Sequence, residues 1–178
     1  MAPRNDFHDF LTKDLYDSLR WLFEGAVAWE AARTKPNPDR RHQQVFGMFT
    51  SLVQARSLYE FFYGKRRDNG DDARASDFAS NTGWKAPTSQ LYKRYMETGK
   101  PAQKRVFHLV FNRSTHSGGA GSELNTKVVE FAVEIRGLVE DFEWNADPEF
   151  REDISCALAR AILEADKAAK FFGIARPV

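Results

Sequence analysis

A single stretch of the chain concentrates the residue types that could do chemistry. Residues 104–124, KRVFHLVFNRSTHSGGAGSEL, hold His108 and His116, two of the chain's four histidines. If residues 102–113 form a helix, its polar side chains fall on one side, opposite a wall of Val and Phe. That side carries Lys104, Arg105, His108 and Asn112, with Arg113 at its end. We therefore predict a basic site, with His108 and Arg113 as candidate catalytic residues and the other three as candidate binding residues.

The cationic neighbours bear on what the two histidines could do. They favour the neutral form of an imidazole, which suits a general base or a hydrogen-bond donor. A histidine on a helix face is often a surface or capping residue, so a structural role for His108 and His116 stays open. The glycines that follow, SGGAG, precede a predicted helix start, where backbone amides can hold a phosphate. They lack the Lys and the Ser or Thr of a P-loop, and we interpret them as a linker.

Arg56 is the second unusual feature. It falls in the middle of the apolar face of a predicted helix over residues 40–63. Leaving a buried guanidinium unpaired costs several kcal/mol. The side chain therefore needs an internal carboxylate, for which the candidates are Asp77, Asp14 and Asp17, or an anion from outside. We expect the internal ion pair and keep the ligand-facing arginine as the alternative.

Motifs for other chemistries are absent from the sequence. The four histidines form no HExxH pattern, the single Cys156 has no second cysteine to pair with, and no GxSxG motif marks a nucleophilic serine. We therefore expect no metal and no cofactor. Cys156 sits in an Ala- and Leu-rich helical pattern, which predicts a small buried side chain.

The elements that position these residues are predicted from apolar residues that recur every three or four positions. This period predicts helices over residues 7–29, 40–63, 88–98, 102–113, 122–142 and 148–173. The widest apolar surface belongs to the second of them, which we expect to be the central helix. The sequence has no alternating strand pattern and no internal repeat. We predict a single all-α domain over residues 1–178, a bundle of four or five main helices with an irregular, loop-rich segment at about 64–121.

Composition sets broad limits on the function. Fifteen Phe and four Trp predict an aromatic-rich core, and a net charge of +1 gives the whole molecule no electrostatic footprint for nucleic acid. Residues 93–113 are locally basic and residues 123–153 locally acidic. These regions either attract each other as solvated helix faces, or the basic one binds RNA or a small anion. No apolar run resembles a signal peptide or approaches the roughly 20 residues of a membrane span, so we expect a cytoplasmic protein without a membrane partner.

Four pieces of the chain, taken in order, resemble a scattered set of uncharacterised bacterial helical proteins. The pieces are ARSLYEFFYG, DDARASDF, Trp84 and HLVFNR, and they lie within residues 54–113. In that set an arginine-bearing helix ends in aromatics, an acidic segment and a tryptophan follow, and a histidine-leucine helix ends in arginine. The resemblance carries no assigned activity. It implies matching positions at Arg56, Asp77, His108 and Arg113.

A looser similarity is to the HEPN superfamily of small helical bundles. Its members often dimerise and, where active, cleave RNA without a metal by means of an arginine and a histidine that are separated by four to six residues. Three pairs in this chain, Arg4 with His8, Arg105 with His108 and Arg113 with His116, are too closely spaced for this signature. The resemblance implies a shared bundle and, as an activity, RNA cleavage.

Three functions follow as hypotheses. The first is a helical binding or interaction module, which could form a homodimer through an aromatic-rich face. The second is a HEPN-like, metal-independent RNase in which His108 acts as acid or base. Arg56, Arg105 or Arg113 would stabilise the charge that develops on the RNA phosphate in the transition state. The third is a sensor of a small anion or nucleotide that uses the same basic residues.

Overall fold

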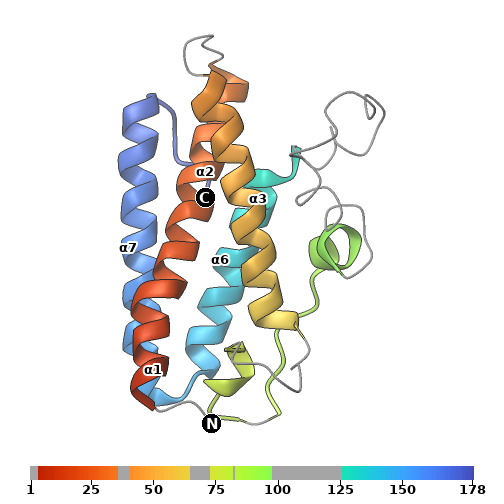
Figure 1. Ribbon diagram of the computed structural model, residues 1–178, viewed down its shortest axis with the longest axis vertical. Helices are drawn as coiled ribbons and strands as arrows, with labels where there is room; N and C mark the ends of the chain where they lie inside the picture. The colour runs from red at the N-terminus through yellow and green to blue at the C-terminus, as the bar shows by residue number, and fades with distance from the viewer. Residues whose placement is uncertain (1–3, 36–40, 65–72, 82, 98–125) are drawn as a thin grey trace.

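The computed structural model describes residues 4–35, 41–64, 73–81, 83–97 and 126–178. Over these residues the chain is an all-α bundle of four long helices, which confirms the predicted fold class (Figure 1). The elements are α1 (Arg4–Asp9), the π-helical turn η1 (Phe10–Leu15), α2 (Tyr16–Thr34), α3 (Arg41–Tyr63), α6 (Val128–Asn145) and α7 (Pro148–Phe172). The first three follow one another without a break and form one long helix. Within the described ranges, no helix is long and apolar enough to cross a membrane.

The ends of the long helices agree best with the sequence where a local signal marks them. Pro148 begins α7, and Gly173 ends it in the left-handed region with φ 67°, which a side chain would strain. The helix expected over 122–142 begins at Val128 and continues to Asn145. The helix expected over 102–113 lies outside the described residues.

The order of the helices requires a long connection between α3 and α6. In Figure 1, α2 rises, α3 descends, α6 descends beside α3, and α7 rises. Parallel neighbours cannot be joined by a short loop, because the chain must first return along the bundle. Residues 64–127 make this return, and we call them the crossover. Its described parts hold the short elements η3 (Ala75–Asp77) and η4 (Tyr92–Met96).

The crossover is fastened to the corner between α6 and α7. The backbone N–H of Ser80 donates to the carbonyl oxygen of Asn145 at 3.0 Å, and the N–H of Asp147 donates to that of Phe78 at 2.7 Å. An isolated β-bridge lies between these two bonds. Backbone groups that leave water need such partners, so these bonds hold the first part of the crossover at the lower end of the bundle in Figure 1.

The central helix is α2 and not α3, which corrects the sequence prediction. α2 packs against α3, α6 and α7, whereas the main neighbours of α3 are α2 and α6. Small residues allow the close approach: a Cβ atom on Gly25 would lie 2.5 Å from the Gly47 carbonyl oxygen and from the Ser51 hydroxyl. The wide apolar surface of α3 misled the prediction because part of it is not covered. Phe46 is 65% exposed and Val53 is 44% exposed.

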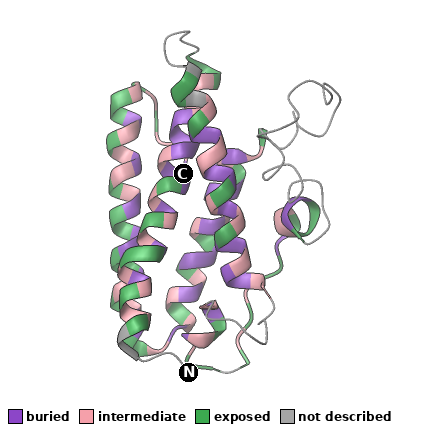
Figure 2. Ribbon diagram, viewed as in Figure 1, coloured by how far each residue is buried: buried purple, intermediate pink, exposed green. Residues whose placement is uncertain are grey.

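Six phenylalanines fill the lower end of the bundle, where Figure 2 shows buried inner helix faces. We call Phe7, Phe10, Phe61, Phe78, Phe142 and Phe150 the phenylalanine cluster. The ring centroid of Phe78, from the crossover, lies 4.9 Å from that of Phe7 and 5.4 Å from that of Phe150. Both pairs meet edge to face, a geometry that adds about 0.5–1.5 kcal/mol per pair beyond the buried area. The aromatic-rich core that the composition predicts is therefore present here.

Cys156 is exposed on α7, so the prediction of a buried thiol is wrong. The buried face of α7 includes Ile154, Ala157, Leu158 and Ala161. A helix turns by about 100° per residue, so Cys156 falls outside that face although the next residue, Ala157, lies within it. Small and apolar neighbours in the sequence did not indicate burial at this position.

Candidate functional site

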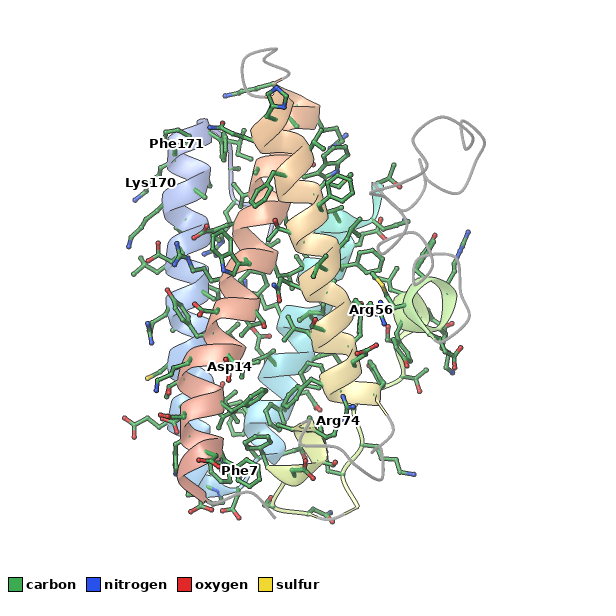
Figure 3. The ribbon with its side chains drawn as sticks, in the orientation of Figure 1. Phe7, Asp14, Arg56, Arg74, Lys170 and Phe171 are labelled. Atoms are coloured by element: carbon green, nitrogen blue, oxygen red, sulfur yellow. The ribbon has the colours of Figure 1, made fainter. Side chains whose placement is uncertain are left out.

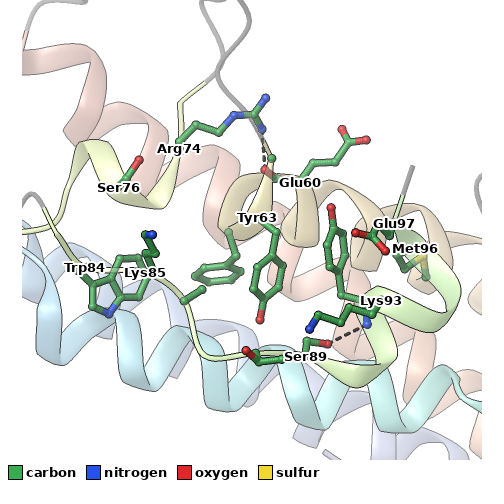
Figure 4. A pocket seen from close by; sticks show the side chains of 15 residues that line it. Glu60, Tyr63, Arg74, Ser76, Trp84, Lys85, Ser89, Lys93, Met96 and Glu97 are labelled. Carbon is green, nitrogen blue, oxygen red and sulfur yellow. Dashed lines mark hydrogen bonds between the residues drawn. The ribbon is translucent and has the colours of Figure 1, made fainter. Parts of the chain in front are cut away.

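A cavity of about 830 Å³ lies between the C-terminal half of α3 and the crossover, and Figure 4 shows it from close by. α3 contributes Glu60 and Tyr63 to its lining, and the crossover contributes Arg74 and much of residues 84–97. Sites for small molecules and cofactors measure roughly 300–1,000 Å³, so the size is suitable for a ligand. We call this space the crossover cavity.

Tyr63 and Tyr92 line the crossover cavity, and Tyr59 packs beside both rings. We call Tyr59, Tyr63 and Tyr92 the tyrosine cluster. Tyr59 and Tyr63 lie four residues apart on α3 and therefore share a helix face. Tyr92, from η4, stacks on Tyr63 with ring centroids 4.6 Å apart and an interplanar angle of 21°. The Tyr63 hydroxyl donates to the Pro87 carbonyl oxygen at 2.5 Å. The cluster thus joins α3 to the crossover through both ring contacts and a hydrogen bond.

The surroundings of the tyrosine cluster keep its hydroxyls protonated. Burial raises the pKa of Tyr63 to about 12, with nearby carboxylates adding to the effect. Burial also raises the pKa of Tyr92, and Glu97 and Glu60 act in the same direction. At neutral pH both rings are therefore uncharged and present their faces without repelling an anion.

Glu134 on α6 connects three parts of the molecule behind the cavity. Its Oε1 accepts a hydrogen bond from the Tyr59 hydroxyl at 2.5 Å and a second from the hydroxyl of Ser89. The Ser89 oxygen in turn accepts the backbone N–H of Tyr92 at 2.8 Å. Burial, together with the bond to Glu134, raises the pKa of Tyr59. One carboxylate therefore holds α3, α6 and the crossover in register.

Charged side chains surround the opening of the crossover cavity. Arg74 donates from Nη1 to the Glu60 carbonyl oxygen at 2.7 Å. Lys85 and Lys93 also line the cavity, and in the part of the chain that the structure describes neither ammonium group has a carboxylate partner. In Figure 4, Tyr63 stands between Lys85 on one side and Lys93 on the other. Two available cations thus flank the stacked rings.

Trp84 closes the cavity at the end nearest the phenylalanine cluster. Its indole N–H donates to Oδ2 of Asp141 on α6 at 3.3 Å, and its ring lies 5.6 Å from that of Phe142. Figure 4 shows Trp84 beside Lys85. Because the indole N–H is bonded to α6, the orientation of the ring that borders the cavity is fixed.

Arg56 pairs with Glu60, one helical turn farther along α3. The distance between Arg56 Nη2 and Glu60 Oε1 is 3.1 Å, and the arginine side chain is only 17% exposed. Among the described residues, the carboxylate that pairs with Arg56 is therefore Glu60 and not Asp77, Asp14 or Asp17. Asp77 accepts the backbone N–H of Arg74 at 3.0 Å and closes η3, and Figure 3 shows Asp14 far from Arg56. A partner four residues away on the same helix lies within reach of the guanidinium, and here it accepts from Nε and Nη2 of Arg56.

Most of the site residues predicted from sequence lie outside the described residues. These are Lys104, Arg105, His108, Asn112 and Arg113. Whether they meet Arg56 stays a prediction. Arg56 and Asp77 are described; neither lines the crossover cavity, although the partner of Arg56, Glu60, does.

The residues that line the cavity were not predicted from the sequence. The neighbouring Tyr92 and Lys93, and the pair of tyrosines four residues apart on α3, were the available signals. Each of these patterns is common on helices, and only the return of the crossover along α3 brings them together.

Among the described residues, no group of three or more His, Cys, Asp or Glu side chains could hold a metal ion. Comparison of the chain with protein-family models, with curated proteins and with solved structures finds no match. The geometry of the site therefore carries the functional argument.

Proposed function

We propose that the protein is a binding module that holds a planar, anionic ligand of the nucleotide class in the crossover cavity. One observation carries this proposal: a stacked pair, Tyr63 and Tyr92, is flanked by Lys85 and Lys93, whose ammonium groups have no carboxylate partner among the described residues. The proposal combines a binding module with the recognition of a small anion or nucleotide.

The chemistry of such a ligand matches the two kinds of side chain present. A base stacks on aromatic rings, and each such contact contributes about 1–3 kcal/mol. A phosphate attracts ammonium groups through charge-assisted hydrogen bonds. Trp84, fixed by Asp141, supplies a third aromatic surface. Lys93 is also the first residue of the basic region 93–113, so an RNA or small anion bound there would share this lysine.

The hydrogen bonds of the cavity favour binding over catalysis. The hydroxyls of Tyr63 and Ser89 are already bonded to Pro87 and Glu134, which holds them in structural roles. The Ser89 oxygen also accepts the backbone N–H of Tyr92, so this hydroxyl serves the packing of η4. The cavity therefore offers surface and charge for recognition.

Titration calorimetry at low salt tests this function with ADP as the ligand and with adenosine and pyrophosphate as its two halves. We expect ADP to bind more tightly than either half, because only ADP uses both the rings and the lysines. The double variant Lys85→Ala/Lys93→Ala should weaken binding by at least about tenfold, or about 1.4 kcal/mol.

A matched control removes two cations outside the cavity lining, with Lys13→Ala and Arg33→Ala. This control should bind ADP as the wild type does. Absence of ADP binding to the wild type, or equal weakening in both double variants, would show that the cavity is not a nucleotide site.

A HEPN-like, metal-independent RNase is the second candidate function. The observation that favours it is the pairing of Arg56 with Glu60, a carboxylate that lines the cavity. Its test is cleavage of single-stranded RNA in EDTA by the wild type and by His108→Ala. Equal cleavage by the two proteins would remove this candidate. As a partner in either function, we propose a second copy of the chain.

A further inference from the structure

The outer face of α7 carries a stripe of exposed residues that the cavity does not use. α7 packs against α2 and α6 on its inner face, and Figure 2 shows exposed residues along its outer side. Residues on this side recur every three or four positions. They are Glu149, Glu152, Cys156, Ala159, Leu163, Lys167 and Lys170, and all are exposed. We call them the α7 stripe.

The middle of the α7 stripe is apolar although no described part of the chain covers it. Leu163 is 53% exposed, and Cys156 and Ala159 are exposed beside it. Acidic residues at the start of a helix and basic ones at its end suit the helix dipole by themselves. The dipole gives no reason for an exposed Leu163 halfway along the helix.

Two copies of the α7 stripe complement each other when the two helices run in opposite directions. Three pairs share one midpoint, which falls between Ala159 and Arg160: Glu149 with Lys170, Glu152 with Lys167, and Cys156 with Leu163. A two-fold axis through that midpoint sets each acid of one helix opposite a lysine of the other. It also sets Leu163 of each copy opposite the partner's Cys156.

We propose that the α7 stripe is a self-association surface, on which a second copy of this chain packs its own α7 in the antiparallel direction. The small side chain of Ala159 lies at the crossing point, where it lets the two helix axes approach closely. Next to it, Arg160 lies over the Tyr16 ring, 3.9 Å from its centroid. Lys167 now bonds Glu164 on its own helix at 2.8 Å, an exposed pair that contributes little and can exchange partners.

This surface differs from the aromatic-rich face expected from the sequence. A single pair of helices buries an interface at the small end of the range for specific complexes, so the dimer should be weak and should depend on concentration. Charge repulsion in the parallel direction, acid against acid and lysine against lysine, selects the antiparallel one.

Sedimentation equilibrium over a range of concentrations tests the proposal. We expect a monomer–dimer equilibrium for the wild type and at least about tenfold weaker association for Leu163→Glu, because this residue lies near the centre of the interface. Val133→Glu, at a residue on α6 that is 50% exposed, is the matched control and should associate as the wild type does. A wild type that stays monomeric, or equal weakening by both substitutions, would overturn the proposal.

A charge exchange tests the antiparallel register. Glu152→Lys should weaken association because it faces the partner's Lys167, and the double variant Glu152→Lys/Lys167→Glu should restore it. Failure of the double variant to associate, while circular dichroism shows that it is folded, would exclude this register.

Thiol chemistry gives an independent measurement. In a Cys156→Ser background, Ala159→Cys places the two thiols next to the axis, and mild oxidation should yield a covalent dimer. The wild type, whose Cys156 faces the partner's Leu163, should not cross-link under the same conditions. Cross-linking of the wild type but not of the Ala159→Cys variant would contradict the register.

Discussion

The C-terminal half of α3 supplies two aromatic clusters that differ in one respect, the presence of hydroxyl groups. Phe61 enters the phenylalanine cluster at the lower end of the bundle, where its ring lies 5.5 Å from that of Phe142. Tyr59 and Tyr63, on a neighbouring face of the same helix, enter the tyrosine cluster beside the crossover cavity. The first cluster is sealed by apolar side chains, and the second is fixed by hydrogen bonds to Glu134 and Pro87.

The phenylalanine cluster is suited to stabilising the fold, and the tyrosine cluster is suited to recognising a ligand. A cluster of phenylalanines gains free energy from buried area and gives no direction to a ligand. A cluster of tyrosines loses part of that gain to polar atoms, but its hydrogen bonds hold each ring at a defined angle. The contrast between the two clusters can be tested by substitutions that should affect one of them more than the other.

The largest expected effect is on the phenylalanine cluster. Phe142 has an exposed fraction of 0% and contacts rings from α3 and from the crossover. Phe142→Ala should lower the free energy of unfolding by about 3–5 kcal/mol, because it opens a cavity in a packed core. Urea denaturation measures this change. Phe46→Ala, at a residue that is 65% exposed, is the control and should cost only about 0.5 kcal/mol. Similar losses for the two variants would mean that the cluster is not the core.

A smaller effect is expected for the hydrogen bonds behind the tyrosine cluster. Tyr59→Phe should lower the free energy of unfolding by about 1–2 kcal/mol, because the Glu134 carboxylate loses a donor. Glu134→Gln should cost a similar amount, and the double variant should cost less than the sum of the two. Tyr16→Phe provides a tyrosine outside the cluster as control. Strict additivity of the first two substitutions would show that Tyr59 and Glu134 are not coupled.

Raising the pH should act on the tyrosine cluster and leave the phenylalanine cluster unchanged. The pKa of Tyr63 rises from its ordinary value of 10.0 to about 12 in the folded protein. The folded state therefore binds this proton more tightly than the unfolded state does. Its stabilising contribution is full below pH 10 and is lost as the pH rises from 10 to about 12.

Urea denaturation of Tyr63→Phe at several alkaline pH values measures this contribution. The variant should lose less stability than the wild type between pH 10 and 12, as the titration of Tyr63 no longer contributes. Tyr16→Phe is again the control. An unchanged slope of stability against pH in Tyr63→Phe would contradict the raised pKa.

The smallest expected effect on stability belongs to the lysines of the crossover cavity. Lys85→Ala/Lys93→Ala should change the free energy of unfolding by less than about 0.5 kcal/mol, because both residues are exposed. The same double variant should weaken ADP binding. A large loss of stability would show that these lysines stabilise the folded state and are not reserved for binding a ligand.

The fold could be predicted from sequence where the signals are local. The period of the apolar residues predicts the four long helices, and Pro148 and Gly173 mark both ends of α7. The identity of the central helix could not be predicted that way. Close packing of α2 depends on contact between Gly25 and Gly47, which lie on different helices.

The candidate site was less predictable, because its residues are brought together by the path of the crossover. Tyr63, Tyr92 and Glu134 come from three elements, and no spacing in the sequence relates them. The catalytic residues predicted from sequence are His and Arg, whereas the cavity presents aromatic rings and lysines among its lining residues. Arg56 was correctly identified as needing a carboxylate, and its partner proved to be the closest one on its own helix, Glu60.

The parallel arrangement of α3 and α6 also has a kinetic consequence. α2 with α3, and α6 with α7, are antiparallel pairs joined by short connections over residues 35–40 and 146–147, and such local pairs form early in folding. The contact between the two pairs must wait for closure of the loop over residues 64–127, which costs chain entropy before any contact compensates for it. We therefore expect Glu134, which joins both pairs to the crossover, to complete its bonds late in folding. A ligand in the crossover cavity should thus slow the unfolding of the protein and leave its folding rate nearly unchanged.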